Sequence, residues 1–285
     1  MGRKLKLRKL AKPLAEARKD LKVDKAVLFV EDLFGGKLKS KPDILIVTDE
    51  NRLEFLRLVR RCFPAKKFDL SFREAVKTPE LRVSHIELEV ECRNRKMLEE
   101  TAVGRKKTGA ITGGFLPGEN LVVVKGRDNT STIVHEMIHA EDEYYLDYEC
   151  STKTMMKILS IIQEGRAKFG EEVFLAGEDF NAERYFVDCE VSSPANFKIH
   201  YGHLIKTHGL LYTARMFLES IKNFNREEQE VYYAFKRVLA WLAHKLGDSQ
   251  AAFRITTEKQ PRTKEELKNF KEFYKKEIEE YQRTN

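Results

Sequence analysis

The sequence predicts an α+β protein, with a mixed α/β N-terminal part that ends in a hairpin and a mainly helical C-terminal part. Before residue 128, short apolar runs rich in β-branched residues are separated by glycine and proline, a pattern typical of strands and turns. From Asp128 onward, apolar residues recur at helical spacing instead. We therefore divide the chain into a basic segment at 1–25, an α/β subdomain at 26–127 and a helical subdomain at 128–285.

In the α/β subdomain, two apolar runs predict strands, AVLFVEDLF at 26–34 and DILIVTD at 43–49. ENRLEFLRLVRRCF at 50–63 has apolar residues at helical spacing and predicts a helix. LRVSHIELEVEC at 81–92 alternates between apolar and polar residues, which predicts a half-buried strand. A cluster of glycine and proline before NLVVVKG predicts a hairpin at 109–125.

In the helical subdomain, we expect the first helix to begin at DNTST, because Asp, Asn, Ser and Thr favour the N-cap position. The spacing of apolar residues and the positions of glycine predict further helices at 152–169, 195–207, 210–223, 226–246 and 262–283. Neither internal repeats nor low-complexity linkers interrupt this part of the sequence.

Composition limits the class of protein. With 285 residues, 42% of them apolar and 34% charged, the chain is long enough to bury a sizeable core. It has no uncharged apolar run of about 18 residues and no apolar stretch after its basic N-terminus, so we expect neither a membrane span nor a secretory signal. The four cysteines form no C-x-x-C pair, as is usual for reduced thiols in a cytoplasmic protein. The prevalence of Lys, Arg and Glu resembles the composition of proteins from heat-loving organisms.

The positive charge is concentrated at the N-terminus. The chain carries a formal charge of +7, and residues 1–20 contain eight Lys or Arg against Glu16 and Asp20, a net +6. Such a segment is suited to contact with nucleic acid or another anionic surface. A solvated leader or helix is the simpler interpretation, because a single basic run has little specificity.

The segment TIVHEMIHAEDEYY contains the motif H-E-x-x-H. On a helix, His135 and His139 lie one turn apart and point the same way, so both imidazoles can bind one Zn²⁺ from one side. Glu136 lies beside them, where it can accept a proton from a water molecule at the metal. The alternative is that these residues form the solvated side of an amphipathic helix, with Ile133 and Met137 on its opposite side.

A catalytic zinc site usually takes three protein ligands and leaves a fourth position for water. The candidate for the third ligand is Glu164, which lies 25 residues after His139 in ILSIIQEGRAKF. That distance allows a loop and a second helix that runs back beside the first. The small side chains of Ser160 and Ala167 fall on the same side as Glu164 and permit close helix approach. The alternative is a surface glutamate on a charged helix.

Together, HEMIH and EGRA resemble the two motifs of the gluzincin metallopeptidases, the thermolysin-like and minigluzincin group with E-G-x-A after H-E-x-x-H. The resemblance implies a zincin-like helical part and a zinc-dependent peptidase that acts on peptides or unfolded protein. It implies three zinc ligands, His135, His139 and Glu164. Glu136 would be the general base, and Tyr201 is our choice for the group that stabilises the oxyanion.

The resemblance covers roughly residues 109–169, and it implies that NLVVVKG is the edge strand that binds an extended substrate. The chain departs from the family in two places. Lys168 stands where thermolysin has an acid that supports a histidine, and Asp142 is the nearest substitute. PGEN lacks the methionine of the aminopeptidase segment G-x-M-E-N, which favours an endopeptidase over an exopeptidase.

Two other hypotheses stay open. HEMIHA also resembles the core of SprT-type proteases, which act on DNA-crosslinked proteins and take a third ligand from a histidine shortly after the helix. Here the next histidine is His200, 61 residues after His139. The other hypothesis is a non-catalytic protein with a degenerate zincin fold that binds nucleic acid or a partner through residues 1–20.

Overall fold

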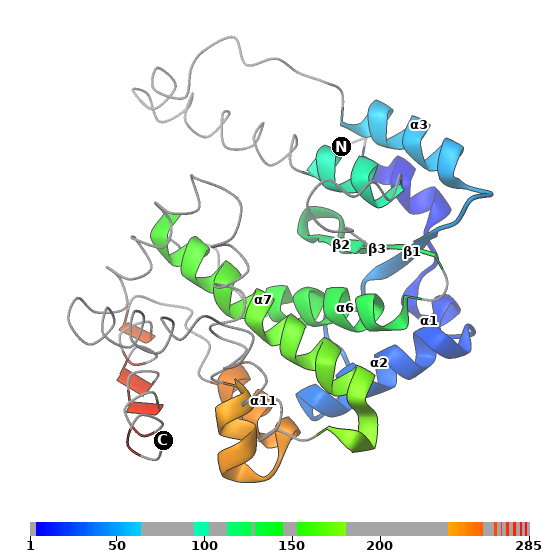
Figure 1. The fold of residues 1–285 in the computed structure, drawn as a ribbon. Helices are drawn as coiled ribbons and strands as arrows, with labels where there is room; N and C mark the ends of the chain where they lie inside the picture. Colours follow the sequence, from blue (N-terminus) through cyan, green and yellow to red (C-terminus); the bar gives the residue numbers. More distant parts are fainter. Residues whose placement is uncertain are drawn as a thin grey trace, which may run out of the picture. The chain divides into compact units, whose positions relative to one another are not determined.

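The structure is a computed structural model that describes residues 4–63, 94–102, 113–126, 129–144, 153–180 and 239–258, together with isolated positions between 265 and 283. Within these ranges the chain is mostly helical and contains one three-stranded mixed sheet (Figure 1). The predicted α+β class is therefore confirmed. No helix in the described part of the chain is both long and apolar enough to cross a bilayer.

By its internal contacts, the chain forms two compact units. The first comprises Met1–Val27 and Ser40–Ala140, and the second comprises Leu28–Lys39 and Glu141–Asn285. The predicted division into segments at residues 25 and 127 followed composition rather than contacts, and it stays a prediction.

The first unit is built on strands β1 (Asp43–Val47), β2 (Gly113–Leu116) and β3 (Leu121–Lys125), in the order β1-β3-β2. β3 pairs in parallel with β1 and antiparallel with β2, which confirms the predicted strand at 43–49 and, over its described residues, the hairpin at 109–125. The prediction that NLVVVKG is an edge strand is wrong, because β3 has a hydrogen-bonded strand on each side. Among the described strands, β1 and β2 lie at the two edges, and β1 also pairs with Lys12 at Ile44.

The N-terminal residues belong to the fold. Lys12 exchanges two backbone hydrogen bonds with Ile44 of β1, at 2.9 and 2.8 Å. Leu7, in the 3-10 helix η1 (Lys4–Leu10), is only 1% exposed. The interpretation of residues 1–20 as a solvated leader is therefore wrong for Leu7 and Lys12, because one side chain is buried and the other residue pairs with the sheet.

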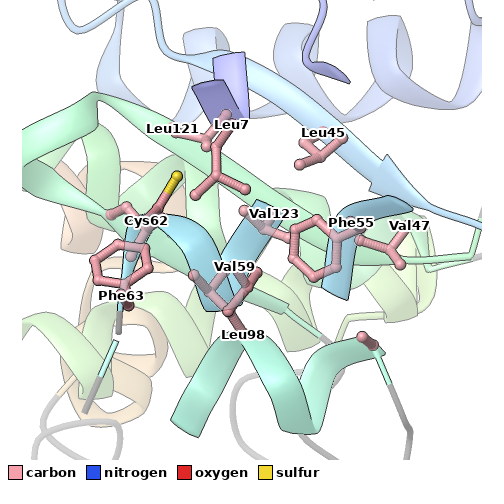
Figure 2. Close-up of a cluster of buried hydrophobic side chains, with 12 residues drawn as sticks. Leu7, Leu45, Val47, Phe55, Val59, Cys62, Phe63, Leu98, Leu121 and Val123 are labelled. Atoms are coloured by element: carbon pink, nitrogen blue, oxygen red, sulfur yellow. The ribbon is translucent and has the colours of Figure 1, made fainter. Parts of the chain in front are cut away.

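An apolar cluster covers one face of the sheet (Figure 2). Side chains alternate between the two faces of a strand, and the cluster accordingly takes two alternate residues each from β1 and β3. Helix α3 (Arg52–Cys62) adds three residues, each about one turn after the last, and confirms the helix predicted at 50–63. The cluster consists of Leu7, Leu45, Val47, Phe55, Val59, Cys62, Phe63, Leu98, Ala102, Leu116, Leu121 and Val123. We call it the sheet core.

Helices α1 (Leu14–Ala17) and α2 (Leu21–Phe34) precede the sheet. The prediction of a strand at 26–34 is wrong. The run AVLFV is short and β-branched, but the buried residues recur at helical spacing over a longer window, namely Val23, Ala26, Val27, Val30 and Leu33. Gly35 follows α2 with φ of 74°, the left-handed conformation that commonly ends a helix.

The described part of the second unit contains α7 (Lys153–Ala176), the 3-10 helix η4 (Gly177–Asp179), helical residues at 239–246 and α11 (Ser249–Glu258). The helix predicted at 152–169 is confirmed and continues to Ala176.

Several predicted elements fall partly or wholly outside the described residues. The helix predicted at 226–246 is described, and helical, over 239–246, and that at 262–283 only at isolated helical positions. The predicted elements at 81–92, 195–207 and 210–223 lie outside the described residues.

Candidate metal centre

The motif H-E-x-x-H lies in α6 (Thr130–Tyr144), which follows β3 directly in the described chain. Asn129 supports the start of this helix. Its side-chain amide donates a hydrogen bond to the carbonyl of Lys125, and its own carbonyl accepts the N–H of Ile133 at 3.1 Å. The helix expected to begin at DNTST is therefore confirmed, with Asn129 as the residue that joins it to the preceding strand.

The side of α6 that carries the motif is largely buried. His135 is 9% exposed and Glu136 is 7% exposed, while His139 is half-buried. Ile133 and Met137 on the apolar side are fully buried as well. The interpretation of this side as the solvated face of an amphipathic helix is therefore wrong for His135 and Glu136.

The imidazole rings of His135 and His139 approach each other through their Nε2 atoms. The Nε2 atoms of His135 and His139 lie 3.1 Å apart, and the rings are inclined by 73° with centroids 4.8 Å apart. Two nitrogens bound to one tetrahedral Zn²⁺ at about 2.0–2.1 Å would be about 3.3 Å apart. The separation of the rings therefore fits shared binding of a single small cation.

Glu164 of α7 completes the group. A carboxylate oxygen of Glu164 and one ring nitrogen each of His135 and His139 all lie within 4.8 Å of one another. Among the described residues, this is the one group of three or more His, Cys, Asp or Glu side chains with such spacing. Two imidazole nitrogens and one carboxylate oxygen form a donor set that suits zinc and leaves room for a further ligand. The structure thus brings together the three side chains that the sequence predicted as ligands.

Glu136 lies against the edge strand. A Cβ atom added to Gly113 of β2 would lie 3.2 Å from Cγ of Glu136, 2.5 Å from Cγ2 of Thr132 and 3.1 Å from the carbonyl oxygen of Val123. Only a residue without a side chain allows β2 to approach α6 this closely. The sequence alone places Gly113 in a turn cluster, and its contact with Glu136 depends on how the strand packs on the helix.

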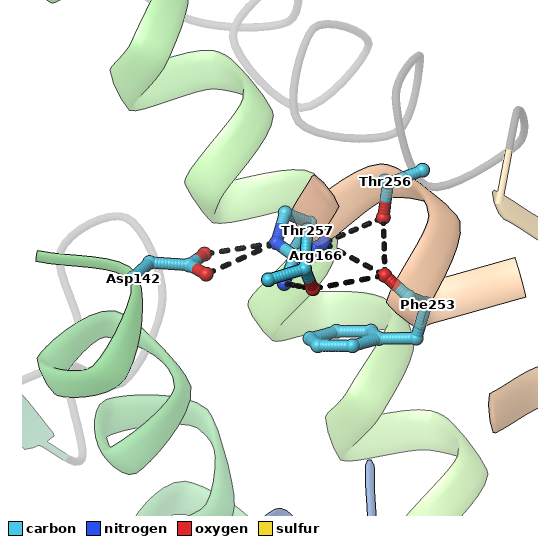
Figure 3. A network of polar contacts seen from close by, with 5 residues as sticks. All are labelled: Asp142, Arg166, Phe253, Thr256 and Thr257. Atoms are coloured by element: carbon cyan, nitrogen blue, oxygen red, sulfur yellow. Dashed lines mark hydrogen bonds and ion pairs between the residues drawn. The ribbon is translucent and has the colours of Figure 1, made fainter. Parts of the chain in front are cut away.

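Arg166 of α7 is a fully buried residue that sequence reasoning missed (Figure 3). Its Nε donates to both carboxylate oxygens of Asp142, at 3.1 and 3.0 Å. Its Nη1 donates to the Phe253 carbonyl at 3.1 Å and to Thr256 Oγ1 at 2.5 Å, and its Nη2 donates to Thr257 Oγ1 at 2.6 Å. The guanidinium carbon also lies 3.9 Å from the centroid of the Phe253 ring. We call these five residues the Arg166 network.

The signal for Arg166 in the sequence is its position in EGRA, between two small residues on a predicted helix. Its partners lie 24 to 91 residues away, so the local pattern does not identify them. Lys168, at the position where the resemblance implies an acid, forms an ion pair of 2.7 Å with Glu171 one turn along α7. The predicted support of a histidine by Asp142 stays a prediction, and Tyr201 lies outside the described residues.

Comparison with known proteins identifies no relative. No protein-family model matches the chain, and neither the curated proteins nor the solved structures contain a match to it.

Proposed function

We propose that this protein is a zinc-dependent hydrolase that cleaves peptide bonds within unfolded or extended chains. The observation that carries the proposal is the meeting of three ligand atoms, from His135, His139 and Glu164, within 4.8 Å of one another. The third residue is distant in sequence from the first two, so helical periodicity alone does not bring it to them. Glu136, the expected base, lies on the same helix directly after the first histidine.

The proposed roles follow from the chemistry of each side chain. The two imidazoles and the Glu164 carboxylate hold the ion, and zinc bound there would lower the pKa of a water molecule and polarise a carbonyl group. Glu136 accepts the proton of the attacking water and then gives it to the departing amine. Because its side chain is buried beside Gly113, few solvent molecules compete for that proton. Tyr201, as the donor to the oxyanion, stays a prediction from the family resemblance.

The edge strand suggests how a substrate binds. Within the described residues, β2 pairs with β3 on one side, and no described strand pairs with it on the other. An extended peptide can pair with such an edge through main-chain hydrogen bonds, without a demand for a particular sequence. Gly113 brings this strand to Glu136. This assigns substrate binding to β2, in place of the strand NLVVVKG that the sequence suggested.

The identity of the third ligand supports the gluzincin type of site over the SprT type. A SprT-type site requires a histidine shortly after the helix, whereas a glutamate lies beside the two imidazoles here. The combination of H-E-x-x-H with E-G-x-A supports the same choice.

The test is a comparison of three proteins for bound zinc and for cleavage of a reduced, carboxymethylated protein. Wild type is expected to bind zinc and to degrade this substrate. Glu136→Gln is expected to keep the zinc and lose cleavage, because the amide cannot accept the proton. Glu143→Gln, on the same helix, is the matched control and is expected to retain both. If all three proteins bind zinc and none of them cleaves the substrate, the result would instead support a structural metal site. A wild type that binds no zinc would contradict the proposal.

A further inference from the structure

Arg166 is a buried cation without exposed surface, and its partner Asp142 is equally buried. A charge in this position destabilises a fold unless its hydrogen bonds are satisfied. Arg166 meets that condition, since donors on all three of its nitrogens reach acceptors on two other helices. Stability alone does not explain the arrangement, because an apolar pair of similar volume is often as stable as a buried ion pair.

The position of the network relative to the candidate ligands is informative. Arg166 lies two residues after Glu164 on α7, and Asp142 lies three residues after His139 on α6. On both helices the ion pair is thus within about one turn, ~5 Å, of a ligand. A helix is stiff over one turn, so the contact that fixes Arg166 to Asp142 also limits the rotation of α7 at Glu164.

The last turn of α6 is itself held in place. Both carboxylate oxygens of Glu141 accept the backbone N–H of Lys39, at 3.0 Å each. The next residue along α6 is Asp142, which binds Arg166. On the other side of the guanidinium, the acceptors belong to α11, and the Phe253 ring of that helix stacks on the same group. Arg166 is therefore oriented from two sides, by α6 and by α11.

We propose that Arg166 is a positioning residue for the metal ligand Glu164, and that α11 tunes metal affinity through its contacts with Arg166. The inference rests on the proposed function in that it takes Glu164 as a zinc ligand. A carboxylate held in the binding geometry before the metal arrives loses little freedom on binding, whereas a mobile one must first be ordered. Loss of the residues that orient a ligand typically lowers metal affinity by about 10–100-fold.

The experiment measures zinc affinity by competition with a chromogenic chelator, and in parallel measures the urea stability of each metal-free protein. Arg166→Met alone leaves the Asp142 carboxylate buried without its ion-pair partner, so this variant is expected to lose both zinc affinity and stability in urea. Replacing both charges, as Arg166→Met with Asp142→Leu, is expected to restore stability because an apolar pair now fills the site. It is not expected to restore affinity, and zinc binding should stay about 10–100-fold weaker than in wild type.

Thr257→Val provides a milder variant, because it removes a single acceptor from Nη2 and changes no charge. We expect a smaller loss of affinity, in the range of a few-fold, with little change in stability. The matched control is Arg254→Met on the same helix, whose side-chain bonds end on Gln250 of α11 rather than on α7. It is expected to bind zinc as wild type does.

The possible outcomes separate the two proposals. If the double variant and Thr257→Val bind zinc as tightly as wild type, Arg166 serves stability alone and this inference is overturned. If wild type itself binds no zinc, the proposed function fails instead. A loss of affinity in the double variant, with wild-type stability in the absence of metal, is the result that a purely structural role does not produce.

Discussion

The sheet core of the first unit and the Arg166–Asp142 pair of the second unit are both buried, but they hold their elements together by different means. The sheet core contains only apolar side chains (Figure 2), whose attraction depends on buried area and little on direction. The Arg166 network depends on direction, because each N–H must point at its acceptor (Figure 3).

The difference teaches what each kind of interior is suited to do. An apolar cluster fixes which elements pack together, and it tolerates changes of shape that preserve volume. A satisfied polar network fixes how a helix is rotated and how far it slides, because small movements break its bonds. A metal ligand needs orientation to within a fraction of an ångström, and the proposed role of Glu164 therefore calls for a directional network of this kind rather than an apolar cluster alone.

The largest expected effect on stability is in the sheet core. Phe55→Ala removes a fully buried ring and should lower the free energy of unfolding by about 3–5 kcal/mol, through reduced burial and the cavity that remains. Leu121→Met in the same cluster conserves volume and should cost less than about 1.5 kcal/mol. Urea unfolding measures both. Zinc affinity of the folded protein should be unchanged in each, and a tenfold loss with Phe55→Ala would remove the contrast between the two regions.

Zinc should stabilise the folded protein by binding to the candidate site, and not by binding to other histidines. A free zinc concentration of about 100 times the dissociation constant should stabilise the folded protein by about 2.7 kcal/mol, and chelation should reverse this. His139→Ala is expected to abolish the stabilisation. His244→Ala replaces an exposed histidine outside the group and is expected to retain it. Thermal unfolding with and without a chelator measures this stabilisation. If zinc stabilises His139→Ala and His244→Ala to the same extent, the ion does not bind at the candidate site.

The contact between β2 and α6 combines features of the sheet core and of the Arg166 network, because it is close packing that also touches the proposed base, Glu136. Gly113→Ala should cost about 1–3 kcal/mol, since the added Cβ would lie 2.5 Å from Cγ2 of Thr132 and near a backbone carbonyl that cannot move away freely. Adding Thr132→Ser removes that methyl group and should recover part of the loss. Gly36→Ala is the control, because a Cβ there meets nothing within 4 Å.

Cleavage should respond to Gly113→Ala more than stability does, because the same Cβ presses on Cγ of Glu136. We expect the turnover number to fall while zinc content stays at the wild-type level. A variant that is destabilised but retains full turnover in its folded fraction would show that β2 does not position Glu136.

The sequence was sufficient where the signal is local. Strand β1, helix α3 and the start of α6 follow from apolar spacing and capping residues within windows of about 5–15 residues, and the structure bears each of them out. The same window misassigned residues 26–34, because the helical repeat that decides the matter begins earlier, at Val23. A short Val-rich run fits a strand and a buried helix equally well.

The candidate site was accessible from the sequence in part. The spacing of His135 and His139 fixes their relation on any helix, and the family resemblance pointed to Glu164. The Arg166 network and the role of Gly113 were not accessible, because their partners are distant in sequence and depend on packing between elements. The choice of edge strand failed for the same reason, since strand order follows from pairing with β1 and not from the hairpin itself.

The smallest expected effect on stability concerns the basic N-terminal residues. Deletion of residues 1–20 is a poor test of nucleic-acid binding, because it also removes Leu7 from the sheet core and Lys12 from its pairing with β1. Replacing the exposed Lys9 and Lys19 with Gln should change the free energy of unfolding by less than about 0.5 kcal/mol. If these residues bind phosphates, retention on DNA should weaken, and the slope of its logarithmic salt dependence should fall by about one for each phosphate that is no longer bound. Retention that is identical to wild type at every salt concentration would exclude these two lysines from any nucleic-acid interface.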